Sequence, residues 1–329
     1  MRRIVFPLSG ELLVSQLAAY GLLVALDAAG IDAFLSHDSV SQSFEPIVEF
    51  VADLDGAARA VRASALEAEQ AVEADIEPGK TGIDRRPVIW ARASFAKDAS
   101  RPARVLRMRA QILATAESAH ARATEGLLSG LGAPAAWGEP EEPKPAQGAT
   151  ALDGVLGNNT SDLVRGVLRP ARALAANLDE QALDRLWHRG SVDGQLDKTG
   201  WAPPGTAVDF LHQWLAALGL ALLPVVHRPF GPSATPACWT GASPRRHGIT
   251  LPLLARPTTI ARLRAVLALG ALASLADHGP SAPREPVTVD QLRSLGLEEV
   301  VSFERLYKRG SGASVAFTYR RGARVSLLR

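Results

Sequence analysis

The chain has 329 residues, of which 47% are hydrophobic and 21% charged, and its 36 Lys and Arg nearly balance its 34 Asp and Glu. This length allows one large domain or two medium ones with a real hydrophobic core. The single cysteine, Cys238, excludes an internal disulfide, and no uncharged apolar run reaches the roughly 18 residues that predict a membrane span. The apolar run at residues 4–8 is too short for a signal peptide, so we expect a cytoplasmic protein that does not enter a membrane.

The first 136 residues carry strand and helix patterns that predict an α+β domain, with strands packed against long helices. A helical apolar period over residues 12–29 stops at Gly30, and Asp53 is placed to cap a second helix that runs to about residue 72. The other elements expected in this part are strands at residues 4–8, 33–37, 44–51 and 88–95, and a long helix at residues 101–131.

Residues 137–150 are rich in proline, glycine and glutamate and predict a linker or exposed loop. This segment separates the N-terminal domain, residues 1–136, from a mainly helical second domain at residues 151–329. The second domain is expected to contain helices at residues 160–176, 179–188, 207–223 and 258–277, a strand at 249–254, and a C-terminal β-meander at 300–307, 314–319 and 324–328.

Recognisable catalytic and cofactor motifs are missing from the sequence. Gly79-Lys80-Thr81 resembles the end of a phosphate-binding loop, but Ala74 stands where that motif needs its first glycine. The seven histidines form no pair at metal-ligand spacing, and Cys238 has no partner pattern for a nucleophile. We therefore predict no catalytic residue, no metal ligand and no cofactor.

The last 25 positions hold seven basic residues and no acidic one, whereas acidic residues outnumber basic ones in the rest of the chain. Such a local positive charge attracts polyanions, of which nucleic acid is the commonest in a cell. A solvated surface hairpin would carry the same residues. The basic positions are Arg305, Lys308, Arg309, Arg320, Arg321, Arg324 and Arg329.

A loop of small polar residues precedes the expected helix at residues 160–176. Asn158, Asn159 and Thr160 suit a backbone that approaches an anion, and Arg165 and Arg169 follow on one helical face four residues apart. An ordinary capped loop would explain the same pattern.

A second arginine-bearing loop follows Trp239. Its residues 239–247 place Arg245 and Arg246 beside an aromatic ring and hydroxyl groups, which can contact phosphates and base edges. The alternative is a loose, solvated loop.

Four segments of the second half follow one another in a recognisable order: Phe210 through Gly219 to Pro224, the Cys238-Trp-Thr-Gly241 element, the strand around Pro252 and the helix after it. This order resembles the Cas8-like large subunits of type I CRISPR interference complexes, especially those of the compact I-G (formerly I-U) systems. The resemblance covers mainly residues 205–275, and the Gly-Leu-rich first helix also fits it.

The resemblance implies a non-catalytic subunit of an RNA-guided antiviral complex. Guide RNA would read the target sequence by base pairing, while this subunit would contact target DNA near the short flanking motif. Its other partners would be the remaining CRISPR subunits and the helicase-nuclease, which it would help to recruit. The basic tail and both arginine pairs are then candidate nucleic-acid contacts.

Two other functions remain open from the sequence. The chain could be a metal-dependent nuclease that uses Asp153 or Asp162, because magnesium sites made of carboxylates and water are hard to recognise in a sequence. It could also be an accessory scaffold protein without nucleic-acid contact.

Overall fold

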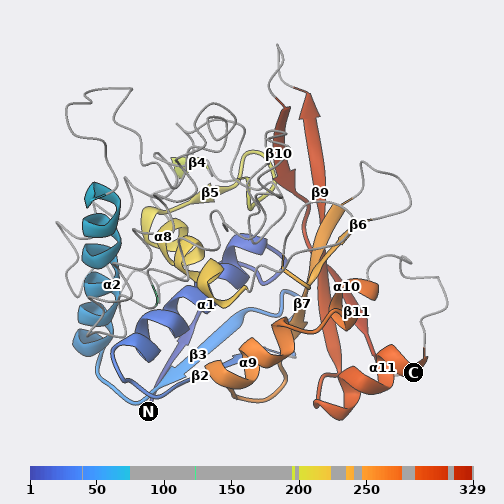
Figure 1. Ribbon diagram of the computed structural model, residues 1–329, viewed down its shortest axis with the longest axis horizontal. Coiled ribbons are helices and arrows are strands. Elements are labelled where there is room, and N and C mark those ends of the chain that lie inside the picture. Colours follow the sequence, from blue (N-terminus) through green and yellow to red (C-terminus); the bar gives the residue numbers. More distant parts are fainter. Residues whose placement is uncertain are drawn as a thin grey trace, which may run out of the picture.

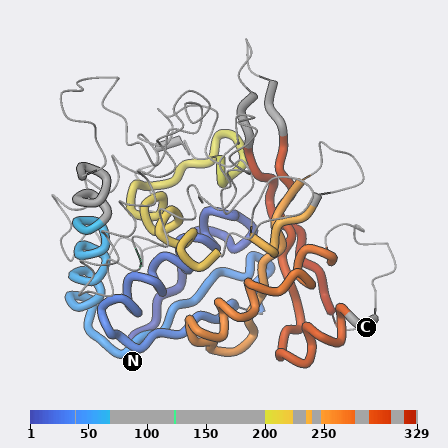
Figure 2. The backbone as a smooth tube through the Cα atoms, in the orientation of Figure 1, coloured from blue at the N-terminus to red at the C-terminus, as the bar shows by residue number. Residues whose placement is uncertain are grey.

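The computed structural model contains both helices and antiparallel sheets, which confirms the α+β class (Figures 1 and 2). Within the described residues, no helix is long and apolar enough to cross a membrane. The residues that the structure describes are 1–38, 40–74, 123, 195–196, 200–223, 235–240, 247–275, 286–309 and 315–327.

The first sheet is built mainly from the N-terminal segment. Its strand order is β1-β3-β2-β8, and every neighbouring pair is antiparallel. Because β3 lies between β1 and β2, those two strands run parallel and are joined across β3 by helix α1, a split β-α-β unit. The strand bounds are Arg2–Val5 for β1, Ala33–His37 for β2, Pro46–Phe50 for β3 and Thr258–Thr259 for β8.

Helix α1 (Leu13–Ala28) lies at the centre of the molecule, and its residues from 13 to 26 are all buried. A helix that is apolar on all sides is expected to be enclosed in this way. The helix ends at Gly30, whose φ is +70°, and the N–H of Ile31 donates to the carbonyl of Leu26 at 2.9 Å. This is a Schellman arrangement, and it confirms the predicted stop.

Helix α8 (Phe210–Gly219) crosses α1 at a pair of glycines. A Cβ atom on Gly21 would lie 1.7 Å from the carbonyl oxygen of Leu215, and one on Gly219 would lie 2.1 Å from that of Leu17. The two backbones therefore touch where no side chain can fit. A 3₁₀ turn, η6 (Leu220–Leu222), continues α8.

Helix α2 (Leu54–Ala74) begins as predicted at Asp53, whose carboxylate accepts a hydrogen bond from the N–H of Gly56 at 2.7 Å. This bond satisfies a backbone donor in the first helical turn. The face of α2 that includes Ala57 and Val61 is buried and contacts α1. The strand expected at residues 88–95 and the helix expected at 101–131 lie outside the described residues, except for residue 123.

The second sheet is formed by the C-terminal half, in the order β10-β9-β7-β6, with β11 also paired to β9. Strand β9 pairs with β7 along one edge and with both β10 and β11 along the other. The expected β-meander is therefore wrong in its last step, because β11 pairs with β9 and not with β10. The bounds are Cys238–Thr240 for β6, His247–Leu253 for β7, Glu299–Arg309 for β9, Val315–Tyr319 for β10 and Ala323–Ser326 for β11.

The single helix expected at residues 258–277 is replaced by a short strand and two helices. Thr259 ends β8 and its hydroxyl accepts a hydrogen bond from the N–H of Arg262, so helix α9 (Ile260–Leu267) begins only after this cap. Gly270, a weak helix former, then separates α9 from α10 (Ala271–Ser274). The remaining elements are α11 (Pro286–Ser294), β4 (Gln195–Leu196) and β5 (Ala207–Val208).

The described parts of both expected domains share one hydrophobic cluster, in which Leu17 of α1, Leu215 of α8 and Leu251 of β7 are all fully buried. Figure 2 shows the blue N-terminal strands beside the orange α9 segment, in agreement with the pairing of β2 with β8. The expected boundary at residues 137–150 lies outside the described residues, as do the helices expected at 160–176 and 179–188. The domain division therefore stays a prediction.

Candidate nucleic-acid interface

The C-terminal strands extend into a two-stranded ribbon. Strand β9 pairs with β7 only from residue 299 to Arg305, whereas its pairing with β10 continues to Arg309. In the part of the chain that the structure describes, β10 is thus the only neighbour of β9 beyond Arg305. Figure 1 shows β9 and β10 rising past the ends of the other strands of this sheet.

Two of the predicted contact residues lie on this ribbon. Lys308 pairs with Ala316 and Arg309 pairs with Val315, which places both basic residues at the far end of the described ladder. The nearest acidic residue along β9 is Glu304, at the level of the sheet. The ribbon therefore places Lys308 and Arg309 in the part of β9 that lies beyond its pairing with β7.

Arg320 and Arg321 lie between β10 and β11, and Arg324 lies within β11, near the base of the ribbon. A guanidinium nitrogen of Arg320 lies 3.3 Å from the Glu304 carboxylate, and Arg324 forms an ion pair with Glu299. Arg305 is buried, with 6% of its surface exposed, and so differs from a surface contact. Arg329 lies outside the described residues.

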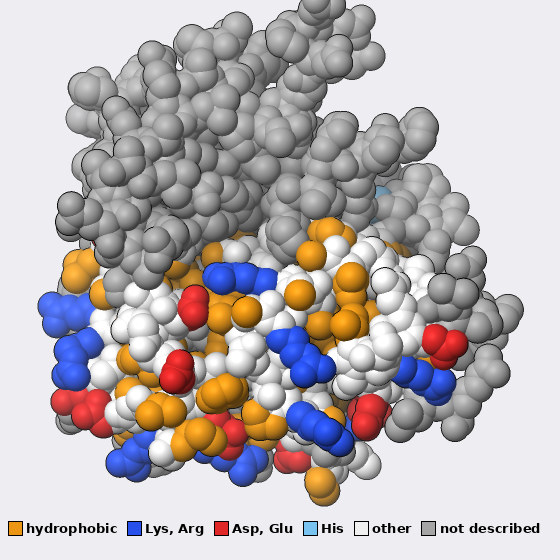
Figure 3. Space-filling view, turned by 60° about the horizontal axis from the view of Figure 1, so that its bottom comes forward, with side chains coloured by type: hydrophobic (Ala, Val, Ile, Leu, Met, Phe, Trp, Pro, Cys, Tyr) orange, Lys and Arg blue, Asp and Glu red, His pale blue; other side chains and the backbone are white. Residues whose placement is uncertain are grey.

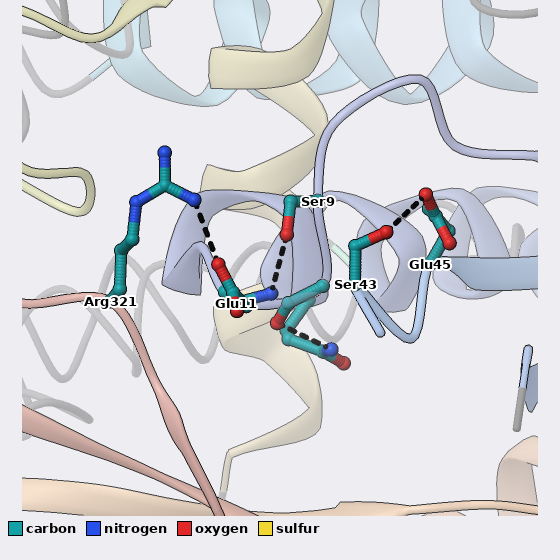
Figure 4. Close-up of polar contacts among 7 residues, drawn as sticks. Ser9, Glu11, Ser43, Glu45 and Arg321 are labelled. Atoms are coloured by element: carbon teal, nitrogen blue, oxygen red, sulfur yellow. Dashed lines mark hydrogen bonds and ion pairs between the residues drawn. The ribbon is translucent and has the colours of Figure 1, made fainter. Parts of the chain in front are cut away.

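Arg321 joins the C-terminal segment to the start of α1. Its guanidinium lies 2.7 Å from the Glu11 carboxylate (Figure 4), and the N–H of Gly322 donates to the Glu11 carbonyl at 2.7 Å. Nearby, Ser43 donates to the Glu45 carboxylate at 2.6 Å in the turn between β2 and β3. Arg321 thus has a structural partner in the protein itself.

These ion pairs reduce the positive field near the body of the protein. Arg320, Arg321 and Arg324 each face a glutamate, so their charges are largely compensated where they lie. Surface pairs of this kind are worth about 0–1 kcal/mol each, and a phosphate could compete for such an arginine. On the face shown in Figure 3, basic and acidic side chains are interspersed with hydrophobic ones over the described surface.

The remaining predicted site residues lie outside the described part of the chain. They are Asn158, Asn159, Thr160, Arg165, Arg169, Arg245 and Arg246, together with the carboxylates Asp153 and Asp162 of the nuclease hypothesis.

A buried hydrogen-bond network near the junction of the two sheets was not predicted from the sequence. The N–H of Leu254 donates to His37 Nδ1 at 3.0 Å, so the ring proton lies on Nε2, which donates to Gln16 Oε1 at 2.8 Å. The Gln16 amide in turn donates to the carbonyl of Gly10 at 3.0 Å. Burial away from water lowers the pKa of His37 to about 3, so the ring is neutral.

A second buried histidine lies at the start of α8. His212 is fully buried, and its Nδ1 lies 2.9 Å from the carboxylate of Asp209, which also accepts the N–H of His212 at 2.7 Å. Burial raises the pKa of the Asp209 carboxyl, but its hydrogen bonds to His212 and the charge of that ring outweigh this effect, so the pKa lies below its usual value. The pair caps the helix, and the Phe6 ring packs edge-on against His212.

Neither histidine belongs to a metal site that the structure shows. Among the described residues, no three His, Cys, Asp or Glu side chains are grouped so that they could hold a metal ion. Cys238 is buried in β6, where it packs as part of the core. The polar groups of His37 and His212 connect structural elements of the described chain.

Comparison of the chain with protein-family models, with curated proteins and with solved structures gives no significant match.

Proposed function

We propose that the protein is a non-catalytic subunit of an RNA-guided CRISPR antiviral complex in the cytoplasm, where it contacts target DNA near the flanking motif and helps to recruit the helicase-nuclease. The sequence pattern of residues 205–275 supports the family, and the β9–β10 ribbon supports a contact with nucleic acid. The arrangement as two domains on either side of residues 137–150 belongs to the same proposal.

The ribbon is the single observation that carries the nucleic-acid part of this proposal. The major groove of duplex DNA is wide enough to admit a two-stranded β-ribbon. Lysine and arginine at the end of such a ribbon can contact phosphates and so fix its position on the duplex. Lys308 and Arg309 occupy that position, while the arginines at the base of the ribbon are held by Glu304, Glu299 and Glu11.

A scaffold protein without nucleic-acid contact is the second candidate. The observation that favours it is the pairing of Arg320, Arg321 and Arg324 with glutamates, since these arginines then serve to hold the C-terminal strands in place. No described feature favours the metal-dependent nuclease, whose carboxylates Asp153 and Asp162 lie outside the described residues.

Purification of the tagged protein from its native cells, followed by identification of RNA and proteins, tests the proposal. We expect short repeat-derived RNAs together with other CRISPR subunits. When bound DNA is identified as well, recovery of the same subunits and RNA with the wild type and with the Lys308→Ala/Arg309→Ala variant, but of target DNA with the wild type alone, would assign the DNA contact to the ribbon.

Recovery of the protein alone, without RNA and without CRISPR subunits, would refute membership in such a complex. Recovery of partner proteins that lack any nucleic acid would instead favour the scaffold.

A further inference from the structure

A cavity of about 220 Å³ lies between the end of α1, the start of β2 and the start of α9. Its apolar wall includes Leu23, Ile31 and Ile260, of which Leu23 is fully buried in the core. The cavity is smaller than the roughly 300–1,000 Å³ of pockets for drug-sized ligands, so its size suits one long side chain.

The charged groups of this cavity are unevenly distributed. Asp27 and Asp32 both line it, and no ion-pair partner of Asp32 exists in the described part of the chain. Among the described residues, Asp27 has an ion-pair partner in Arg264 of α9, whose guanidinium is 3.9 Å from the Asp27 carboxylate, with both side chains about half exposed. That contact is at the limit of an ion pair and is weak in water.

The backbone adds to the negative character of the site. The cavity contains Gly30 and Ile31, the residues that close the C-terminal end of α1. The carbonyl end of a helix carries a partial negative charge and favours cations within about one turn. The start of α9 also lines the cavity, and its N–H groups carry the opposite partial charge, one of which is satisfied by a hydrogen bond from the N–H of Arg262 to the hydroxyl of Thr259.

We infer that this cavity binds an arginine side chain of a partner polypeptide. An arginine has an apolar stem that can lie against Ile31 and Ile260, and a planar guanidinium that is weakly hydrated and pairs well with carboxylates. Asp32 supplies the free carboxylate, and Asp27 can exchange its distant contact with Arg264 for the incoming guanidinium. The inference does not depend on nucleic-acid binding, because the cavity involves neither β9 nor β10.

Backbone amide NMR of the full ¹⁵N-labelled chain tests the inference, with the peptide acetyl-Gly-Arg-Gly-amide as the probe. We expect saturable shifts of the amides of Gly30, Ile31 and Asp32, and none with a peptide in which citrulline, which is neutral and nearly the same shape, replaces arginine. The Asp32→Asn variant should weaken binding about tenfold or more, because a hydrogen-bonded charge is lost.

The control variant is Asp290→Asn, which removes an exposed aspartate of α11 away from the cavity and should leave the shifts unchanged. Equal shifts with the citrulline peptide, or an unchanged affinity in Asp32→Asn, would overturn the inference. Saturable shifts with free agmatine but none with the peptide would also overturn it, since the site would then accept a small amine and not a partner's side chain.

Discussion

His37 connects three segments of the chain through one imidazole ring. Its backbone N–H donates to the carbonyl of Leu254 at 2.8 Å, its Nδ1 accepts the N–H of the same residue, and its Nε2 bonds to Gln16. Protonation would place a hydrogen on Nδ1 directly against the Leu254 N–H, and it would bury a charge. The network is therefore compatible only with the neutral ring.

The protonation of His37 predicts a specific loss of stability in acid. The folded pKa of about 3 lies below the unfolded value of about 6.5, so the unfolded chain binds a proton first. The stabilisation is fully present above pH 6.5 and is lost as pH falls toward 3, with a slope of up to about 1.4 kcal/mol per pH unit. We expect this slope in urea unfolding measured from pH 7 to pH 5.

The matched variant for this experiment is His37→Asn, whose side-chain oxygen can accept the Leu254 N–H but does not titrate. Its unfolding free energy should be lower at pH 7 and should depend less on pH between 7 and 5. If the unfolding free energy changed with pH by the same amount in the wild type and in His37→Asn, His37 would not be the cause of the loss of stability in acid.

Asp209 allows a second prediction at the same scale. Replacement by Ala removes the helix cap and the partner of a buried imidazole, so we expect a loss of about 2 kcal/mol or more in unfolding free energy at pH 7. Because the folded pKa is lowered, the contribution of the carboxylate is present above about pH 4 and disappears as pH falls through the folded pKa.

Thermal unfolding at pH 7 checks this prediction, with Thr259→Ala as the control. Thr259 caps α9 by a longer bond of 3.4 Å at an exposed site, so its loss should cost less. A destabilisation of Asp209→Ala no larger than that of Thr259→Ala would contradict the role given to the Asp209–His212 pair.

At the scale of elements, the crossing of α1 and α8 depends on glycine. Gly219 has an ordinary helical φ of −59°, so alanine would suit the backbone there, but its Cβ would lie 2.1 Å from the carbonyl oxygen of Leu17 and 3.1 Å from the backbone nitrogen of Gly21. We expect Gly219→Ala to separate the helices and to lower the unfolding free energy by about 3 kcal/mol, as overpacked cores do.

The control is Gly270→Ala between α9 and α10. Gly270 has a similar φ of −61°, and a Cβ there would meet nothing within 4 Å. Urea unfolding should give this variant a stability equal to or slightly above the wild type. Equal unfolding free energies for Gly219→Ala and Gly270→Ala would contradict the close contact between the backbones of α1 and α8.

The elements with strong local signals could be predicted from the sequence. The apolar run of α1 ends at a glycine, β2 has the predicted bounds, and Asp53 caps α2. The interruption of the helix expected at residues 258–277 was missed, because the apolar period continues on both sides of Gly270. Strand pairing was also missed, since nothing local specifies that β11 returns to β9.

The same limit applies to the candidate interface. The concentration of basic residues in the tail was evident in the sequence, but the glutamates that compensate them were not, since Glu11 and Arg321 lie 310 residues apart in the chain. The contact of His37 with Leu254 spans 217 residues. Such pairs form only when the chain folds, so the sequence alone could not separate the arginines at the base of the ribbon from Lys308 and Arg309.

At the scale of the whole molecule, a formal charge of only +2 means that nucleic-acid binding must depend on where the basic residues lie. The two sheets share one core, from which the β9–β10 ribbon extends. Contacts with phosphates release bound counterions, so the affinity falls as salt rises, and each lost contact reduces the slope of log K against log salt by about 1.

The most direct measurement is the affinity for a fluorescent DNA duplex across a salt series, made with the wild type, Lys308→Ala/Arg309→Ala and the control Arg320→Ala/Arg324→Ala. We predict that the affinity of the wild type falls steeply as salt rises. The slope of log K against log salt should decrease in magnitude by about 2 in Lys308→Ala/Arg309→Ala. The slope should change less in the control variant, because Arg320 and Arg324 already face glutamates. Contact between the ribbon and nucleic acid would be contradicted if the folded wild type did not bind the duplex at low salt. It would also be contradicted if the two double variants changed the slope of log K against log salt equally, because the ribbon would then contribute no special contact with nucleic acid.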